Sequence, residues 1–170
     1  AAFIAIFKHD LKGLLAYSTV SHLGLVVFLT GLGSPLAAVA AVFHVLNHAA
    51  FKASLFMIAG IVDHETHSRD MRQLGGLWKF MPWTATLSMV AAASMAGVPL
   101  TNGFLSKEMF FTEAVVGTSG MYAWLVPALV TLAGVFSVAY SLRFVHDTYF
   151  NGELGDVPSD HPHEPPLGMK

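Results

Sequence analysis

The sequence predicts an all-α fold, a polytopic bundle of transmembrane helices, and three observations lead to this prediction. Of the 170 residues, 54% are hydrophobic and 12% are charged, whereas a soluble domain usually carries ~25% charged residues. Four apolar stretches are long enough to cross a bilayer, which takes about 20 residues. Lysine and arginine are also distributed unevenly between the segments that connect these stretches. Together these features exclude an ordinary soluble globule.

The predicted transmembrane part covers residues 1–150. Its four spans run roughly over 13–32, 35–62, 82–116 and 121–142. Residues 1–7 are expected to be the end of a preceding span, and a Gly33-Ser34 turn joins the first two full spans. Residues 151–170 contain four prolines and almost no apolar periodicity, so we expect this tail to be a solvated linker.

The third span is predicted to be a broken helix, because it contains the sequence MAGVPLTNGF. Pro99 lacks an N–H group and its ring clashes with the carbonyl of Met95, and Gly97 and Gly103 flank it. Free backbone groups at membrane depth persist only where protein buries them or a hydrated cavity meets them. Broken helices with a charge beside the break mark ion sites in many transporters.

The basic residues predict the orientation of these spans. Seven of the nine lie in three segments that share one side of the membrane if there are four crossings: Lys8, Lys12, Arg69, Arg72, Lys79, Arg143 and Lys170. The opposite turns contain none. By the positive-inside rule we expect loop 63–79 and the C-terminal tail to be cytoplasmic, in a multi-pass protein of the plasma membrane.

Ionisable residues inside the second span give the first functional signal. His44, His48 and Lys52 follow one another at intervals of four, so they form a polar stripe about 12 Å long on one helix face. His22 on the first span can add a polar group at similar depth. A buried lysine costs ~2.5 to 3.5 kcal/mol on insertion scales, so it needs a partner or a role.

Three interpretations of this stripe are open. The histidines can be hydrogen-bonded fasteners between helices. They can bind a metal, since histidines at i and i+4 suit zinc. However, Val45 stands where the HExxH motif has glutamate, and a lysine on the same face repels a cation, so no metal is predicted. A proton relay is the sharpest functional hypothesis, because histidine titrates near neutral pH and lysine does so when desolvated.

Lys107 and Glu108 follow the predicted break by a few residues. They form either an interfacial pair at a helix end or an ionisable pair inside the membrane. The sequence has no cysteine and a net charge of −2, which excludes thiol chemistry and nucleic-acid binding. No phosphate-binding loop or hydrolase motif is present, so neither a cofactor nor an enzyme activity is predicted.

Three blocks occur in one order: DLKGLLAYSTVSHLG, HVLNHAAFKASLFM and VPLTNGFLSKEMFF. They resemble the proton-conducting antiporter-like membrane subunits of respiratory complex I and of Mrp-type antiporters. The stretch GIVDHETHSRDMRQLGGLWKFMP is most similar to the large A subunit of Mrp antiporters. The resemblance implies two inverted five-helix repeats, of which this chain covers the end of the ninth helix to the thirteenth.

The resemblance also implies roles for individual residues. His44, His48 and Lys52 match the relay of the eleventh helix, Lys107 matches the lysine of the broken twelfth helix, and Glu108 is its acidic neighbour. Lys12, at the start of the tenth helix, and His22 are weaker candidates for proton transfer.

The expected function is therefore proton translocation within the large A subunit of a multisubunit Na⁺/H⁺ antiporter. Protons would move along the membrane midplane, with water in the gaps between side chains. Expected partners are the other subunits of the antiporter, the lipid bilayer, protons and Na⁺. The alternatives are a proton-pumping subunit of complex I or a related hydrogenase, without a redox centre of its own, and a non-conducting structural subunit.

Overall fold

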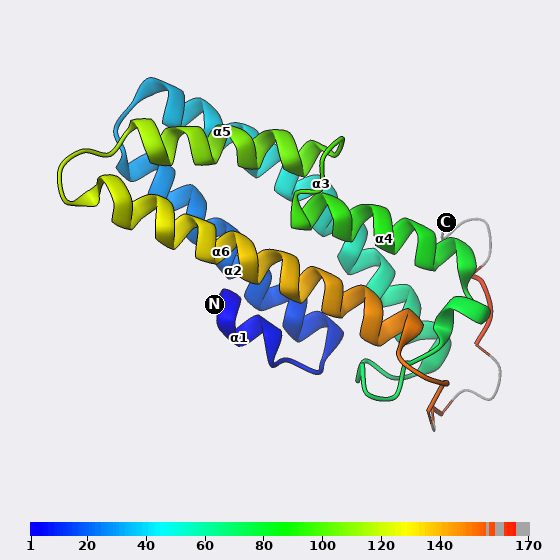
Figure 1. Cartoon of the computed structure of the whole chain (residues 1–170). Coiled ribbons are helices and arrows are strands. Elements are labelled where there is room, and N and C mark those ends of the chain that lie inside the picture. The colour runs from blue at the N-terminus through cyan, green and yellow to red at the C-terminus, as the bar shows by residue number, and fades with distance from the viewer. Residues whose placement is uncertain (156, 159–161, 166–170) are drawn as a thin grey trace.

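The structure, a computed structural model, describes residues 1–155, 157–158 and 162–165, which form a bundle of helices (Figure 1). No strand occurs in these residues, only an isolated bridge between Asp10 and Asp70. The all-α prediction is confirmed. The elements are α1 (Ala2–Ile6), α2 (Leu11–Gly31), α3 (Pro35–Thr66), the 3₁₀ turn η1 (Leu77–Lys79), α4 (Pro82–Ala96), α5 (Asn102–Val116), α6 (Tyr122–Val145) and the π-helical turn η2 (His146–Phe150).

In this part of the chain three helices are long and apolar enough to cross a membrane: α2, α3 and α6 together with η2. Helices α4 and α5 have 15 residues each, or about 22 Å, which is less than the ~30 Å hydrocarbon core. Neither spans the bilayer alone. The predicted third span thus corresponds to two short helices in succession, and a count of four crossings stays a prediction.

Side-chain caps define where the long helices begin. The Asp10 carboxylate accepts a hydrogen bond from Gly13 N at the start of α2. At the start of α3, Ser34 Oγ accepts from Ala37 N at 2.9 Å and donates to the buried carboxylate of Glu113 at 2.8 Å. These polar contacts satisfy N–H groups that have no partner within a helix.

The second span is longer than the sequence indicates. Helix α3 continues to Thr66 and ends at His67, whose φ is 54°. Asp63 and Glu65 therefore lie in its last turn, and Glu65 is buried, although the sequence placed both on a solvated loop. The apolar run ends earlier than the helix because the last turn leaves the apolar part of the bundle.

The loop between α3 and α4 is attached to the start of α2. Leu11 N donates to Arg69 O at 3.0 Å, and Met71 N donates to His9 O at 2.9 Å. A hydrogen bond from the Arg72 side chain lowers the pKa of the Asp70 carboxyl to about 2. Four apolar side chains of this loop are buried in the core: Met71, Leu74, Leu77 and Met81.

The described residues of the tail also contact the helices. Glu164 Oε1 accepts hydrogen bonds from Trp83 N at 2.7 Å and Thr84 N at 3.2 Å, so it caps the start of α4. The His163 ring lies 2.9 Å from the Glu65 carboxylate. These tail residues bind the helices, whereas the solvated linker stays a prediction for the rest of the tail. His161 and Lys170 lie outside the described residues.

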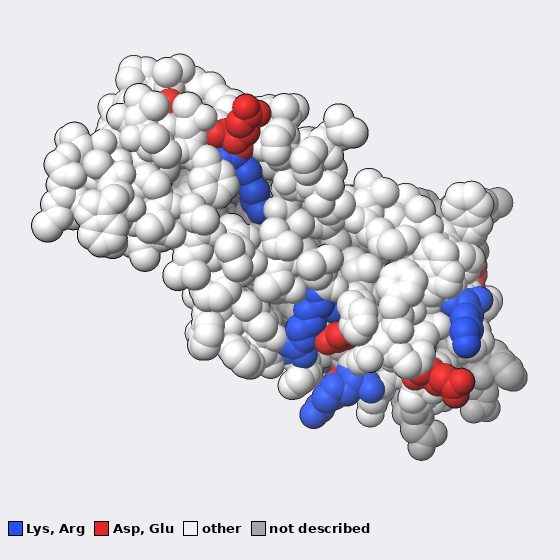
Figure 2. Space-filling view, viewed as in Figure 1, with Lys and Arg blue, Asp and Glu red and all other residues white. Residues whose placement is uncertain are grey.

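Two apolar clusters occupy the two ends of the bundle. The larger includes Leu11, Leu55 and Phe144, and the smaller includes Leu29 and Phe110. Most of the buried polar residues of α2, α3 and α6 lie between them, whereas Glu65 and Thr66 lie at the end of α3. In the face shown in Figure 2, Lys and Arg gather toward the end that carries α1 and the α3–α4 loop, apart from one charged spot over α5. The core of the bundle thus has a polar layer between two dry ones.

Candidate functional site

The break between α4 and α5 is formed by residues 97–101 and confirms the predicted broken helix. Gly97 has φ of 83° and Leu100 has φ of 73°, so the chain leaves the helical region twice. Thr101 then caps α5 by accepting from Phe104 N. A Cβ on Gly103 would lie 1.8 Å from Ser94 O, so only glycine lets the two half-helices meet this closely.

An amide ladder attaches the break to α3. Asn102 Nδ2 donates to Asn47 Oδ1 at 3.1 Å, and Ser94 Oγ donates to Asn102 Oδ1. Asn47 is the neighbour of His48 in the sequence. The ladder therefore fixes the break beside the polar stripe of α3.

Lys107 binds the end of α4. Its ammonium donates to Met95 O at 2.9 Å, to Ala96 O at 2.8 Å and to Ser137 Oγ on α6 at 2.9 Å. The last carbonyls of a helix lack partners within it, and the helix dipole makes this end negative. The break thus supplies a site that suits a cation inside the bundle.

Glu108 points elsewhere. It is exposed, and no hydrogen bond or ion pair joins it to Lys107 among the described residues. It borders a groove between α4, α5 and α6 that is also lined by Gly97, Lys107 and Thr112. The structure therefore does not form the Lys107–Glu108 pair that the sequence suggested.

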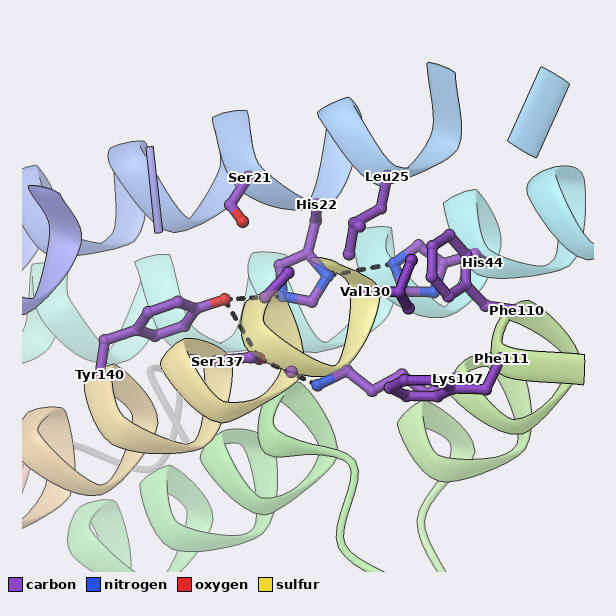
Figure 3. Close-up of a pocket in the computed structure, with 12 residues that line it drawn as sticks. Ser21, His22, Leu25, His44, Lys107, Phe110, Phe111, Val130, Ser137 and Tyr140 are labelled. Carbon is purple, nitrogen blue, oxygen red and sulfur yellow. Dashed lines mark hydrogen bonds between the residues drawn. The ribbon is translucent and has the colours of Figure 1, made fainter. Parts of the chain in front are cut away.

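Two histidines from different helices meet in the polar layer (Figure 3). His22 Nδ1 of α2 lies 3.1 Å from His44 Nε2 of α3, and His44 Nδ1 lies 3.1 Å from Ser106 Oγ of α5. All three side chains are buried. The weaker candidate His22 is thus in direct contact with the stronger candidate His44.

Two hydroxyl groups of α6 join these histidines to Lys107 (Figure 3). Tyr140 Oη lies 3.1 Å from His22 Nε2 and 3.1 Å from Ser137 Oγ, the group that accepts from Lys107. Side chains alone therefore connect His44 to Lys107. Polar groups of four helices are in direct contact here, whereas proton transfer along them, and water between them, stay predictions.

His48 and Lys52 are less well connected. The His48 ring centroid lies 5.3 Å from that of His22, but its buried Nε2 has no hydrogen-bond partner among the described residues. Lys52 donates instead to Leu15 O at 3.1 Å and to Ser18 Oγ on α2. The stripe of α3 is therefore interrupted between His48 and Lys52, which share no direct hydrogen bond among the described residues.

Lys12 lies apart from this cluster. Its ammonium forms an ion pair with Asp63 at 2.8 Å, and the two side chains are 38% and 33% exposed. The pair joins the start of α2 to the last turn of α3. Within the described part of the chain, no group of three or more His, Asp or Glu residues is placed to hold a metal ion.

Sequence reasoning missed Ser106, Ser137 and Tyr140. Ser137, Tyr140 and Ser141 stand at i, i+3 and i+4 in an otherwise apolar span, so they share one helix face. That spacing was the available signal for α6. A small cavity of about 10 Å³ lies among His22, His44, Lys107 and Tyr140, which is room for about one water.

The chain matches, over residues 1–137, the family described as "NADH:quinone oxidoreductase/Mrp antiporter, TM". It is 62% identical over 170 residues to a protein of Rhizobium meliloti that is named as the A/B subunit of a probable K(+)/H(+) antiporter, covering 99% of this chain and 17% of that protein. It is 47% identical to the A subunit of the Na(+)/H(+) antiporter of Alkalihalophilus pseudofirmus, covering 97% of this chain and 23% of that protein.

A solved structure shares the fold. The Mrp complex from Dietzia sp. DQ12-45-1b contains a chain with a TM-score of 0.81 and 44% sequence identity, and the match covers 99% of this chain and 18% of that one. The chain spans about a fifth of the length of these relatives. The predicted resemblance is confirmed: this is a membrane protein, and the chain belongs to the NADH:quinone oxidoreductase/Mrp antiporter transmembrane family.

Proposed function

We propose that this chain is the proton-translocating part of the large A subunit in a multisubunit complex that exchanges a monovalent cation for protons. The observation that carries the proposal is a row of titratable groups, the buried His44 and His22 and the partly buried Lys107, which hydrogen bonds connect across α2, α3, α5 and α6. Helix fasteners need hydrogen bonds, but they do not need two imidazoles and an ammonium in one connected row.

Each group in the row suits proton transfer. Imidazole carries a proton on either nitrogen, so His22 and His44 can accept on one side and donate on the other. Lys107 sits at the negative end of α4, which stabilises its charged form, while burial disfavours that form. The two opposing effects allow loading and unloading of a proton as the neighbourhood changes. His48 and Lys52 extend the route through water.

We propose only the class of the exchanged cation, a monovalent cation. One relative is named for K⁺/H⁺ exchange and another for Na⁺/H⁺ exchange, so Na⁺ and K⁺ are both to be tested. The partners are the other subunits of such a complex. The complex I alternative shares this family, but both curated relatives described above are named as antiporter subunits.

The test uses the complete antiporter complex in inverted membrane vesicles that lack other antiporters. Proton movement is followed with a pH-sensitive dye after Na⁺ or K⁺ is added. His44→Gln keeps hydrogen-bonding groups but cannot titrate, so exchange should fall about 100-fold. His146→Gln, which changes an exposed histidine at the end of α6, is the matched control and should leave the rate unchanged.

Exchange at the wild-type rate in His44→Gln would contradict the proposal. Loss of the assembled complex in His44→Gln, together with normal exchange in His48→Gln, would instead favour a structural subunit. The proposed orientation has its own test in this cysteine-free chain. Cysteines at Gln73 and Ser119, both exposed, should react from the cytoplasmic and the opposite side respectively.

A further inference from the structure

Tyr140 and Ser137 occupy an unusual place between the histidines and Lys107. Each hydroxyl contacts a titratable group on one side and the other hydroxyl on the other side, at distances of 2.9 to 3.1 Å. Tyr140 is 0% and Ser137 is 4% exposed. Ser137 Oγ also donates to Met95 O at 3.2 Å, the carbonyl that Lys107 binds, whereas Tyr140 Oη contacts only His22 and Ser137 among the described residues.

One row of hydrogen bonds, the hydrogen-bond chain, joins Ser106, His44, His22, Tyr140 and Ser137. Its donors and acceptors can be arranged in two opposite directions, and in both directions every buried polar group has a partner. In the first, Ser106 donates to His44 Nδ1, His44 Nε2–H to His22 Nδ1, and His22 Nε2–H to Tyr140 Oη, which donates to Ser137. These roles use one proton on each group and one of the two imidazole tautomers.

In the second direction the donors and acceptors are exchanged. Tyr140 donates to His22 Nε2, His22 Nδ1–H to His44 Nε2, and His44 Nδ1–H to Ser106 Oγ. The Ser106 hydroxyl then donates to Gly103 O, 3.1 Å away. Ser106 has an acceptor in both states, so the chain can reverse without leaving a buried donor unpaired.

We propose that Tyr140 and Ser137 carry protons between His22 and Lys107 and that each passage reverses the direction of this hydrogen-bond chain. The inference rests on the proposed function, of which it specifies one step. A proton arriving from the Ser106 side reaches His44 Nδ1, His44 gives its Nε2 proton to His22 Nδ1, and His22 gives its Nε2 proton to Tyr140 Oη. Tyr140 then gives its phenolic proton to Ser137 Oγ, and Ser137 gives its hydroxyl proton to neutral Lys107 Nζ. Each hydroxyl keeps one proton, and the net result is one proton on Lys107.

The space beside these hydroxyls leaves little room for a row of waters that would bypass them. The adjoining cavity has room for about one water, and the four helices around it fill the remaining space. The loss of either hydroxyl therefore interrupts the row of direct hydrogen bonds between His22 and Lys107. Lys107 faces Ser137 directly, so the last transfer needs no movement of the backbone.

The experiment is Tyr140→Phe in the complete antiporter complex, with cation-dependent proton movement in vesicles as the measurement. The variant removes one oxygen and keeps the ring. Exchange should fall about 100-fold, while the amount of assembled complex stays normal. Tyr149→Phe is the matched control and should exchange at the wild-type rate. It alters another buried tyrosine, in the turn η2 that directly follows α6.

A second pair of variants tests the proposal even if Tyr140→Phe does not fold. Ser137→Ala should lose exchange and Ser137→Thr, which keeps the hydroxyl, should restore it. The wild type should also exchange more slowly in D₂O, and the residual exchange of Ser137→Ala should lose this dependence. A merely structural serine would not give this combination.

The outcomes separate the two proposals. If Lys107→Ala is inactive but Tyr140→Phe and Ser137→Ala exchange at the wild-type rate, the hydroxyl bridge is overturned and the proposed function stands. If Lys107→Ala and His44→Gln are fully active as well, the proposed function fails with it. If the complex with Tyr140→Phe does not assemble, the two Ser137 variants decide whether the hydroxyl bridge exists. Loss of exchange in Ser137→Ala with recovery in Ser137→Thr supports it, and equal exchange in both overturns it.

Discussion

Lys52 and Lys107 are both lysines inside an apolar helical bundle, and each donates to backbone carbonyl oxygen and to one serine hydroxyl, Lys52 to one carbonyl and Lys107 to two. Lys52 lies against the continuous helix α2, where it donates to Leu15 O. Lys107 lies against the end of α4, where it donates to Met95 O and Ala96 O. The two sites differ in how many other donors use the same carbonyls.

Leu15 O is crowded. It accepts from the hydroxyls of Ser18 and Thr19 at 2.9 Å each, in addition to Lys52 and the N–H of its own helix. A carbonyl has two lone pairs, so the donors around Leu15 compete. Met95 O and Ala96 O lie in the last turn of α4, where no later helical N–H reaches them. At the end of a broken helix the last backbone carbonyls are free to bind an ammonium group. Within an intact helix the same carbonyls already accept from N–H groups.

The two lysines also differ in whether hydrogen bonds connect them to the buried histidines. Lys107 joins a hydrogen-bond chain that leads to His22 and His44. The hydrogen bonds of Lys52 lead only to Leu15 and Ser18 of α2. We therefore expect the two lysines to contribute unequally, and the following variants test that inequality.

The largest effect is expected from Lys107→Ala, which should reduce exchange by at least about 100-fold while the complex still assembles. Lys107→Arg should not restore activity, because arginine stays protonated. Lys52→Ala should cause a clearly smaller loss. The measurement is cation-driven proton movement in vesicles, normalised to the assembled complex. Equal losses in Lys52→Ala and Lys107→Ala would remove the distinction drawn between them.

Gly97→Ala should have the next largest effect. A Cβ at this position would lie 2.7 Å from Lys107 Cδ, and the residue has φ of 83°, which costs a non-glycine residue about 1 to 2 kcal/mol. Lys107 must shift away from Met95 O. We expect a lower melting temperature of the complex and an exchange rate reduced about tenfold or more. Gly60→Ala, where a Cβ meets nothing within 4 Å, is the control.

A smaller effect is expected from Ser18→Ala, which removes the hydroxyl partner of Lys52. Loss of one partner of a buried charged group costs about 1 to 3 kcal/mol. Thermal unfolding of the complex should therefore occur at a lower temperature, with a modest change in exchange. If Ser18→Ala stops exchange as fully as Lys107→Ala does, Lys52 belongs to the main route and the comparison is wrong.

The smallest effect is expected from Lys12→Ala. Its ion pair with Asp63 is partly exposed, and such pairs contribute ~0 to 1 kcal/mol. Stability should change by no more than this, and exchange should stay near the wild-type rate. Measurement at low and high salt should show the difference in stability disappear as salt rises. A transport defect in Lys12→Ala would assign this lysine to the proton route.

The sequence predicts the helices and the break because both depend on local features. Run length and hydropathy place α2, α3 and α6 within a few residues of their observed bounds, and Gly97 and Pro99 mark the interruption. Helix α3 extends past the predicted span end at Val62 to Thr66, since polar residues continue the helix. A polar segment at a membrane surface contains no local signal that distinguishes a last helical turn from a loop.

The partners of the buried lysines could not be predicted in the same way. Ser18, Ser106 and Ser137 are small residues in apolar spans, where serine most often serves close helix packing. Their meaning depends on which helices touch and at what depth, and this is a property of the tertiary arrangement. His44 and Lys107 were identified because ionisable residues are rare in such spans, whereas their connection through Tyr140 required the structure.

The cap that Glu164 provides at the start of α4 has a consequence for biosynthesis. Glu164 lies 81 residues after Trp83, to whose N–H group it binds, so the ribosome completes α5 and α6 before this cap exists. The other end of α4 likewise waits for Lys107 and Ser137. Both ends of α4 therefore obtain these partners only after the later residues that supply them have been synthesised.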